Sequence, residues 1–286
     1  MTKLYNEAEE YIKDVFYSDS YDTSCIFNLQ SVVHEKLKND TVGKDVDYYG
    51  HKKGVVHVSS LSKCLRGVAY EMLGYKATEE IKDRVLGVFK AGQLFEDFIV
   101  DSMGDRVLDR QTEYSLQYKN ITLVGRDDGT FLDEKGNRRV LEVKSVHSDS
   151  FWYREKEGTL VAYQNQIQLQ VYLWLRRKLY NDVVDGMFCY VSKDDCTIVS
   201  VPVKYNENII NEIVIPALEL LNEAYEKQDA SVCPVPDTIT FNKQRRQFNK
   251  NWLCSYCSYH KLCAGQDWED VASKEVTAKN KDLKGK

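Results

Sequence analysis

The chain has 286 residues, 43% of them hydrophobic and 29% charged, with a formal net charge of −5. This composition is typical of a globular protein, and no apolar run is long enough to cross a bilayer. The first residues lack a basic region followed by an apolar block, so we expect a cytoplasmic protein whose eight cysteines are free thiols or metal ligands. Because the net charge is negative, any binding to a polyanion must use local basic patches.

The N-terminal part of the chain predicts mainly helices. Residues 1–53 form a predicted N-terminal segment of two polar amphipathic helices, which end near Asn39, and a charged loop. A helix is expected after the capping residues Ser59–Ser62 and should end at Gly74. A second helix is expected from about Thr78 to Met103.

The middle of the chain then changes to a period of two, which indicates strands. We predict an α/β fold in which a central mixed sheet, containing an antiparallel meander, is flanked by helices. Residues 54–268 would form this domain, and residues 269–286 a disordered tail. The expected strands are Val107–Tyr118, Ile121–Leu132, Arg138–Val146, Met187–Ser192 and Thr197–Val203, and the expected helices are Val161–Tyr180 and Glu207–Lys227.

Candidate catalytic residues lie on the meander. Glu142 and Lys144 share one strand face because side chains alternate, and the neighbouring strand carries Asp128. Two carboxylates on adjacent strands suit Mg²⁺ or Mn²⁺, which could support phosphodiester hydrolysis while Lys144 orients water or stabilises negative charge. Asp127 competes with Asp128 for this position, and Asp133 is a more remote option. The alternative interpretation of Glu142 and Lys144 is an exposed ion pair.

Two helices could add polar groups to the same site. Gln168 and Tyr172 are four residues apart, so they lie on one face of the expected helix 161–180. Glu96, one turn after Gly92, could supply a third carboxylate. The alternative interpretations are a glutamine-rich exposed stripe for the first pair and a surface position for Glu96.

Four cysteines have the spacing of a metal centre. Cys254, Cys257 and Cys263 are close in sequence, and Cys64 stands far upstream. Four thiolates suit either structural zinc or an iron–sulfur cluster, and the spacing alone does not separate the two. Either centre would join the two ends of the domain.

Two segments could bind a nucleic-acid strand. Lys243–Lys250 carries four positive charges and no acid, and Phe151–Arg154 follows the third strand of the meander with three aromatic rings. The alternatives are a solvated charged face for the first segment and rings packed on the core for the second. Smaller basic clusters occur at Lys52–Lys53, Arg138–Arg139 and Arg176–Lys178.

Six short motifs, in this order, resemble the RecB-type branch of the PD-(D/E)XK nuclease superfamily, and most closely its iron–sulfur members. These members include the CRISPR-associated RecB-like exonucleases and many phage-encoded relatives. The motifs span about Ser59 to Cys263. They are Ser60–Arg66 with Tyr70 and Leu73–Gly74, Gly92 with Glu96, Gly125–Gly129, Glu142 with Lys144, Gln168 with Tyr172, and the cysteine triplet.

The resemblance implies a restriction-endonuclease-like core and assigns roles to the candidate residues. Asp128, Glu142, Lys144, Gln168 and Tyr172 would be catalytic. The four cysteines would hold a [4Fe–4S] cluster. Relatives commonly have a metal-binding histidine where this chain has a glutamate, which leaves the metal preference open. The positions assigned to the catalytic Mg²⁺ or Mn²⁺ are Glu96, Asp128, Glu142 and Val143.

The expected function is therefore a Mg²⁺- or Mn²⁺-dependent deoxyribonuclease, with exonuclease action on single-stranded DNA or DNA ends. Two alternatives stay open. The first is a CRISPR adaptation factor that trims spacer precursors with an integrase or recombination proteins. The second is a non-catalytic iron–sulfur module that binds DNA. A bacterial cytoplasm, or the host cytoplasm for a phage protein, is the expected location.

Overall fold

The computed structural model describes residues 35, 39, 52–78, 83–156, 161–181, 185–242, 245–264 and 268–284. The predicted N-terminal helices, apart from residues 35 and 39, and most of the loop that follows them lie outside these residues. In the described part, no helix combines the length and the apolar character that crossing a membrane requires.

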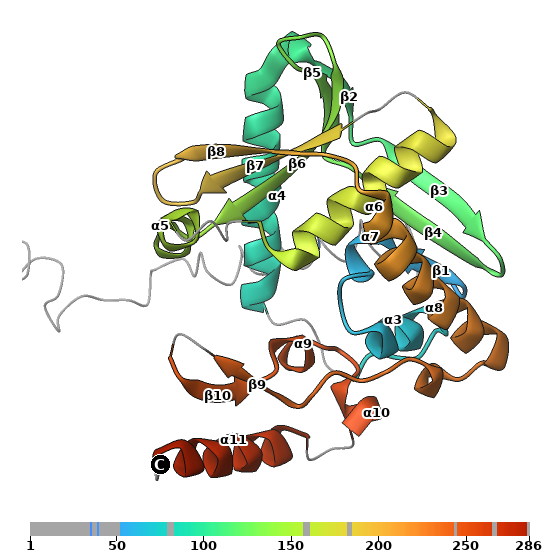
Figure 1. Ribbon diagram of the computed structural model, residues 1–286, viewed down its shortest axis with the longest axis vertical. Helices are drawn as coiled ribbons and strands as arrows, with labels where there is room; N and C mark the ends of the chain where they lie inside the picture. The colour runs from blue at the N-terminus through green and yellow to red at the C-terminus, as the bar shows by residue number, and fades with distance from the viewer. Residues whose placement is uncertain are drawn as a thin grey trace, which may run out of the picture.

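A five-stranded mixed sheet forms the centre of the fold (Figure 1). Its order is β2-β5-β6-β7-β8, with β6 and β7 parallel and the other pairs antiparallel. The predicted mixed sheet with flanking helices is therefore confirmed. The strands are β2 (Val107–Arg110), β5 (Gly129–Leu132), β6 (Arg138–Val146), β7 (Asp185–Ser192) and β8 (Ile198–Val203).

The two faces of β6 meet different helices because its side chains alternate. Leu141 and Val143 pack in one apolar cluster with Ile99 and Val100 of α4 (Asp83–Met103). Val140 packs in the other cluster, which contains the buried face of α6 (Tyr163–Leu179). Even-numbered β6 positions near Val140 therefore face α6, and the candidate pair Glu142 and Lys144 belongs to this set.

The predicted meander is wrong in one respect, because its first two strands each divide between two sheets. Val107–Tyr118 becomes β2 and β3 (Glu113–Tyr118), and Ile121–Leu132 becomes β4 (Ile121–Arg126) and β5. β3 and β4 belong to a second sheet, of order β1-β4-β3, with β1 at Val55–His57. Gln111, with a φ of 54°, lies at the first break, and Asp127 and Asp128 form the second.

Asp127 provides the physical reason for these breaks. Its carboxylate accepts a hydrogen bond from the Thr112 N–H at 3.0 Å, and its own N–H donates to the Thr112 carbonyl at 3.2 Å. These bonds replace strand pairing where the chain passes from one sheet to the other.

Helices flank the smaller sheet and link it to the C-terminal part. α3 (Leu65–Met72) contacts α8 (Ile215–Lys227), and one π-helical turn, Ile210–Val214, joins α8 to the short α7 (Glu207–Ile209). α5 (Ser148–Lys156) follows β6 directly.

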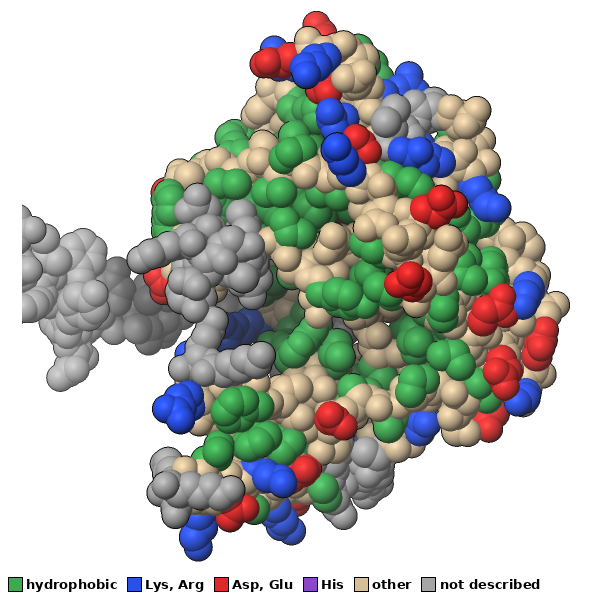
Figure 2. All heavy atoms as spheres, in the orientation of Figure 1, with side chains coloured by type: hydrophobic (Ala, Val, Ile, Leu, Met, Phe, Trp, Pro, Cys, Tyr) green, Lys and Arg blue, Asp and Glu red, His purple; other side chains and the backbone are tan. Residues whose placement is uncertain are grey.

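We call residues 239–284 the C-terminal module. It comprises the hairpin β9 (Ile239–Asn242) and β10 (Gln247–Lys250), α9 (Trp252–Ser255), α10 (His260–Ala264) and α11 (Trp268–Lys284). The predicted disordered tail 269–286 is therefore wrong through Lys284, because α11 packs on β10 and buries Ala272 completely. Figure 2 shows that the surface is hollowed between this module and the sheet domain.

Candidate active site

Glu142 and Lys144 form a close ion pair on the α6 face of β6. Lys144 Nζ lies 2.5 Å from Glu142 Oε1, and the Glu142 residue is only 1% exposed. Gln168 of α6 lies across from the pair, with its Oε1 at 3.5 Å from the lysine nitrogen. The pair is therefore not the exposed surface bridge of the alternative interpretation.

Asp128 lies beside this pair, at the break between β4 and β5. Its Oδ2 accepts a hydrogen bond from the backbone N–H of Val143 at 2.6 Å. β5 and β6 are antiparallel with Gly129 opposite Leu141, so the aspartate is held next to the middle of β6. The Val143 side chain points into the α4 cluster, and its N–H is committed to Asp128.

Three carboxylates influence one another at this point, and we call Glu96, Asp128 and Glu142 the acidic cluster. Burial raises the pKa of Asp128 well above its usual value, and the negative charges of Glu142 and Glu96 raise it further. Burial also raises the pKa of Glu142, although Lys144 opposes this shift. Concentrated negative charge of this kind favours a cation.

Glu96 reaches the cluster from α4, a different element from those that carry the other two acids. The Gln111 side-chain amide donates to its Oε1 at 2.9 Å, and Gln111 itself sits at the break between β2 and β3. Nothing in the sequence indicated that Gln111 would support the site, because its left-handed backbone conformation is set by the division of the strands.

Tyr172 closes the side of the site that faces the core. It is only 3% exposed and belongs to the main apolar cluster. Burial raises its pKa, as does the charge of Glu142, whereas a hydrogen bond with Gln168 lowers it. A Cβ added to Gly125 would lie 2.9 Å from the tyrosine ring, so this glycine allows the ring to pack against β4.

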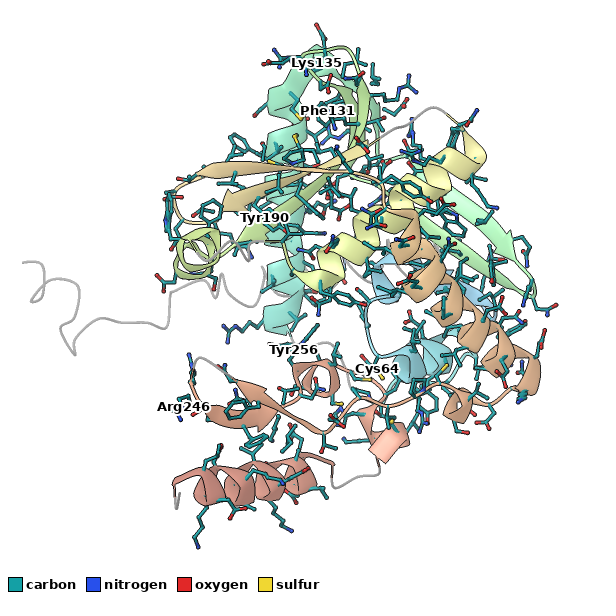
Figure 3. All side chains as sticks on the ribbon, in the orientation of Figure 1. Cys64, Phe131, Lys135, Tyr190, Arg246 and Tyr256 are labelled. Carbon is teal, nitrogen blue, oxygen red and sulfur yellow. The ribbon has the colours of Figure 1, made fainter. Side chains whose placement is uncertain are left out.

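Tyr190 is a second buried tyrosine that the sequence did not single out (Figure 3). It lies opposite Lys144 in the β6–β7 register, and its hydroxyl accepts a hydrogen bond from Asn165 at 3.0 Å. Its place on a strand next to the Glu142 strand, with the parity that faces α6, is the signal that could have found it.

Asp127 is directed away from the acidic cluster into a buried polar network. It is 1% exposed and contacts the Tyr114 hydroxyl. Arg176 of α6, 2% exposed, lies 3.8 Å from Asp127 and 2.8 Å from Asp109. Burial raises the pKa of Asp127 to about 6. Asp133, the remote option, instead binds Arg139 at 2.8 Å in a turn.

One buried oxygen in the site has no partner among the described residues, and it is Glu142 Oε2. A buried acceptor of this kind is costly unless something binds it. A divalent cation with oxygen ligands would satisfy it, so the carboxylate oxygens of the acidic cluster are suitable ligands for Mg²⁺ or Mn²⁺. As placed, however, no three His, Cys, Asp or Glu side chains of the described residues form a complete metal site.

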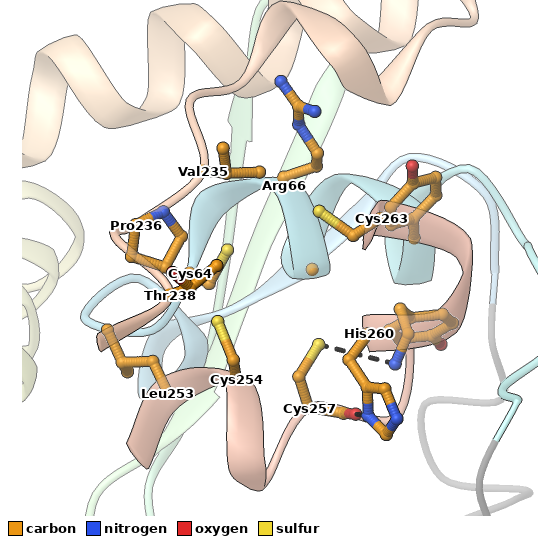
Figure 4. A pocket seen from close by; sticks show the side chains of 13 residues that line it. Cys64, Arg66, Val235, Pro236, Thr238, Leu253, Cys254, Cys257, His260 and Cys263 are labelled. Atoms are coloured by element: carbon orange, nitrogen blue, oxygen red, sulfur yellow. Dashed lines mark hydrogen bonds between the residues drawn. The ribbon is translucent and has the colours of Figure 1, made fainter. Parts of the chain in front are cut away.

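The four predicted cysteine ligands line a single pocket of about 110 Å³ (Figure 4). We call it the thiol pocket. Cys64 directly precedes α3, and the other three come from the segment around α9 and α10. Burial raises the pKa of Cys254 to about 11, and the charges of its three cysteine neighbours raise it too. Within the described part of the chain these thiols are not placed as a complete metal site either, so a four-cysteine metal cluster is not established by this arrangement.

Polar groups and a glycine surround these thiols. The Tyr259 N–H donates to Cys257 Sγ at 3.4 Å, and a Cβ on Gly67 would lie 3.3 Å from the same sulfur. Arg66 donates to the Cys233 carbonyl at 2.8 Å and thereby ties α3 to the segment that precedes the module.

The remaining predicted residues separate into core and surface. Phe151 is completely buried, as the core interpretation predicts, whereas Trp152 is 48% exposed on α5. The side chains of Tyr153 and Arg154 lie outside the described part. One arginine in each of two smaller basic clusters forms an ion pair within the protein. Arg139 binds Asp133, and Arg176 binds Asp109.

A comparison with family models matches residues 36–264 to the PD-(D/E)XK nuclease superfamily. The chain belongs to this superfamily. The match begins before residue 54, where the sequence had placed the start of the nuclease domain. It includes the acidic cluster, the Glu142–Lys144 pair and the thiol pocket.

The fold of this chain is similar to that of one solved structure, SSO0001, and two further structures match at lower TM-scores. The crystal structure of SSO0001 is 20% identical, with a TM-score of 0.51, and the match covers 83% of this chain and 98% of that chain. The alkaline exonuclease LHK-Exo from Laribacter hongkongensis is 14% identical, with a TM-score of 0.42, over 64% of this chain and 95% of that chain. The complex of LHK-Exo with dAMP has a TM-score of 0.46 at 14% identity, over 61% and 91% of the two chains. Among curated protein sequences, none matches this chain.

Proposed function

We propose that this member of the nuclease superfamily is a Mg²⁺- or Mn²⁺-dependent deoxyribonuclease that acts as an exonuclease on single strands or DNA ends. The observation that supports the metal dependence is the buried Oε2 of Glu142, which has no partner within the described residues. It lies in a cluster with Asp128 and Glu96, in which the charge of Glu96 raises the pKa of both Asp128 and Glu142. An apolar or purely structural site would not place two further carboxylates beside a buried carboxylate that has an unsatisfied oxygen.

Each residue of the site would have its own role in the reaction. Asp128, Glu142 and Glu96 would hold the cation, which when bound supplies Lewis-acid stabilisation of phosphate charge and acidifies water. Lys144, 2.5 Å from Glu142, places a positive charge where negative charge develops on the phosphate. Gln168 orients the lysine from α6, and Tyr172 excludes water from the buried side.

Cleavage of a labelled oligonucleotide tests this proposal. We expect wild-type protein with Mg²⁺ or Mn²⁺ to release nucleotides from the ends of a single strand, and EDTA to stop the reaction. Glu142→Gln and Lys144→Met should each lower the rate by about 100-fold or more. Glu134→Gln, in an exposed turn, is the matched control and should leave the rate unchanged. Full activity in both site variants would refute the assignment.

The thiol pocket supports a second, structural centre. We propose that Cys64, Cys254, Cys257 and Cys263 bind a [4Fe–4S] cluster, because four sulfurs from two ends of the domain line one pocket. Anaerobically purified protein should be brown, and analysis should give about four irons per chain. Cys254→Ser should lose the colour while Cys196→Ser, an exposed cysteine, keeps it. A colourless protein containing one zinc would refute this part.

The two alternative functions rest on the sequence resemblance alone. A role in CRISPR adaptation predicts co-purification with an integrase, and no observation in the described structure favours that partner. A non-catalytic DNA-binding module predicts no cleavage with any divalent ion. The contribution of Glu96 to the acidic cluster argues against that version, because the replacement of histidine by glutamate leaves a group that can bind a hard cation.

A further inference from the structure

The C-terminal module carries a concentration of positive charge that the proposed reaction does not use. From Thr238 to Gln266 the sequence contains no Asp or Glu, in a chain whose formal net charge is −5. The positive residues in this range are Lys243, Arg245, Arg246, Lys250 and Lys261. A patch of this kind on an acidic protein is a local attraction for a polyanion.

Most of these charges belong to the β9–β10 hairpin and its turn. Arg245 and Arg246 are exposed at the turn, and Arg246 has a φ of 47°. The Arg245 N–H donates to the Asn242 side chain at 2.9 Å, which fixes the start of this bend. Figure 3 shows Arg246 at the turn end of the hairpin. The hairpin therefore presents its charges at a projecting edge.

Aromatic rings are exposed next to these charges. Trp252 is 48% exposed and Tyr256 is 76% exposed, and they lie four residues apart at the two ends of α9. Phe241 is 44% exposed, with its ring 5.0 Å from that of Phe248 on the paired strand. Large exposed rings beside cationic groups are the combination that binds unpaired bases and the phosphates between them.

Helix α11 packs against both strands of the β9–β10 hairpin. The Asn280 side chain accepts from the Phe248 N–H at 2.6 Å and donates to the Phe248 carbonyl at 2.9 Å, so it occupies the outer edge of β10. Thr238 donates to Glu275 of α11 at 2.6 Å. This support makes the hairpin a rigid platform and reduces the entropy that binding would cost.

The hairpin also lies across a hollow from the sheet domain, which carries the acidic cluster. In Figure 1 it is placed below the sheet domain, on the side toward which α5 and the end of β6 project. Figure 2 shows the hollow between the two parts. A strand bound on the sheet domain could therefore continue across this hollow onto the module.

The geometry points to a second binding surface for single-stranded DNA on the C-terminal module. Arg245, Arg246 and Lys250 bind backbone phosphates, and bases stack on Trp252 and Tyr256. The inference rests on the proposed function for the choice of DNA as ligand. It adds a site, away from the acidic cluster, that retains the strand.

Binding without cleavage tests this surface independently of catalysis. Full-length protein is titrated into fluorescent oligo(dT) in EDTA at several KCl concentrations, and anisotropy gives the affinity. Arg245→Ala/Arg246→Ala should weaken binding about tenfold and reduce the salt slope by about 1.4, or about 0.7 for each phosphate that the protein no longer neutralises. Trp252→Ala and Tyr256→Ala should each weaken binding at least about fivefold with little change in the slope.

A matched control removes the same charge elsewhere. Arg106 and Lys135 are exposed on the sheet domain, so Arg106→Ala/Lys135→Ala should leave the affinity and the slope unchanged. Equal affinities for the two double variants would overturn the proposal, as would duplex DNA that competes as well as the single strand. Binding is measured in EDTA, where no cleavage occurs, so a failed nuclease assignment and a failed binding surface give different results.

Discussion

The backbone N–H of Val143 donates a 2.6 Å hydrogen bond to Oδ2 of Asp128. This bond places an aspartate from the break between two strands against the strand that carries Glu142 and Lys144. The antiparallel β5–β6 pairing fixes which residues of β6 lie beside Asp128. The hydrogen bond fixes the direction of the Asp128 carboxylate. The acidic cluster is thus held by backbone groups of the central sheet rather than by flexible loops.

Metal binding should stabilise the protein through this cluster. Asp128 and Glu142 repel each other when both carboxylates are charged, and Glu142 Oε2 has no partner in the described structure. We expect 5 mM Mg²⁺ or Mn²⁺ to raise the melting temperature of wild-type protein by about 2–5 °C, because a ligand that binds only the folded state stabilises it. Differential scanning fluorimetry measures this shift.

The control for the metal experiment is a site variant that keeps its fold. Asp128→Asn retains an oxygen for the Val143 N–H but removes one negative charge, so its melting temperature should respond much less to the same ions. An equal shift in Asp128→Asn would mean that the ions bind elsewhere.

Arg176 should be essential for stability although it does not contact the acidic cluster. It is 2% exposed and pairs with Asp109 at 2.8 Å, and Asp127 lies at 3.8 Å. Arg176→Met would leave Asp127 buried without its cation, at a cost of about 2–4 kcal/mol in the free energy of unfolding. Urea unfolding measures the change. Lys178→Met, on the exposed side of the same helix, should cost less than about 0.5 kcal/mol.

The strand β6 and its two faces were predictable from sequence because alternation determines both at once. Glu142 and Lys144 share a face by parity alone, and the structure shows that α6 covers that face. The mixed sheet followed from the same pattern. Asp128 was expected on the strand next to Glu142, and the structure places it at the break just before Gly129, which begins the strand that pairs with β6.

The breaks in the strands were not predictable by the same means. The alternation stops in the polar runs Asp109–Glu113 and Arg126–Asp128, but a short polar run inside a strand pattern does not show that the chain changes sheets there. The cause is tertiary, because Asp127 bonds to both backbone groups of Thr112 and to Arg176 on a distant helix. α11 was missed for a similar reason. Its polar composition suggested disorder, but its helix is stabilised by packing on β10 and by Asn280.

Two glycines should respond in opposite ways to the same substitution. A Cβ on Gly125 would lie 2.7 Å from Val58 and 2.9 Å from Tyr172, both in the packed core. We expect Gly125→Ala to lower the free energy of unfolding by about 1–3 kcal/mol. Gly87, within α4, has no atom within 4 Å of an added Cβ, so Gly87→Ala should raise stability by up to about 1 kcal/mol. Thermal or urea unfolding of both variants checks the pair, and destabilisation by both would contradict this difference in packing.

Asn280 should determine how firmly the hairpin is held. Its side chain bonds to both the N–H and the carbonyl of Phe248, and removal leaves these groups at the open edge of β10. Asn280→Ala should therefore cost about 1–2 kcal/mol locally and speed amide hydrogen exchange at Phe248 about tenfold. Exchange at Val140, in the central sheet, should not change, because the hairpin is a separate two-stranded sheet. Lys279→Ala, at the neighbouring position of α11, is the matched control, and equal exchange at Phe248 in the two variants would show that the amide contact does not hold the edge.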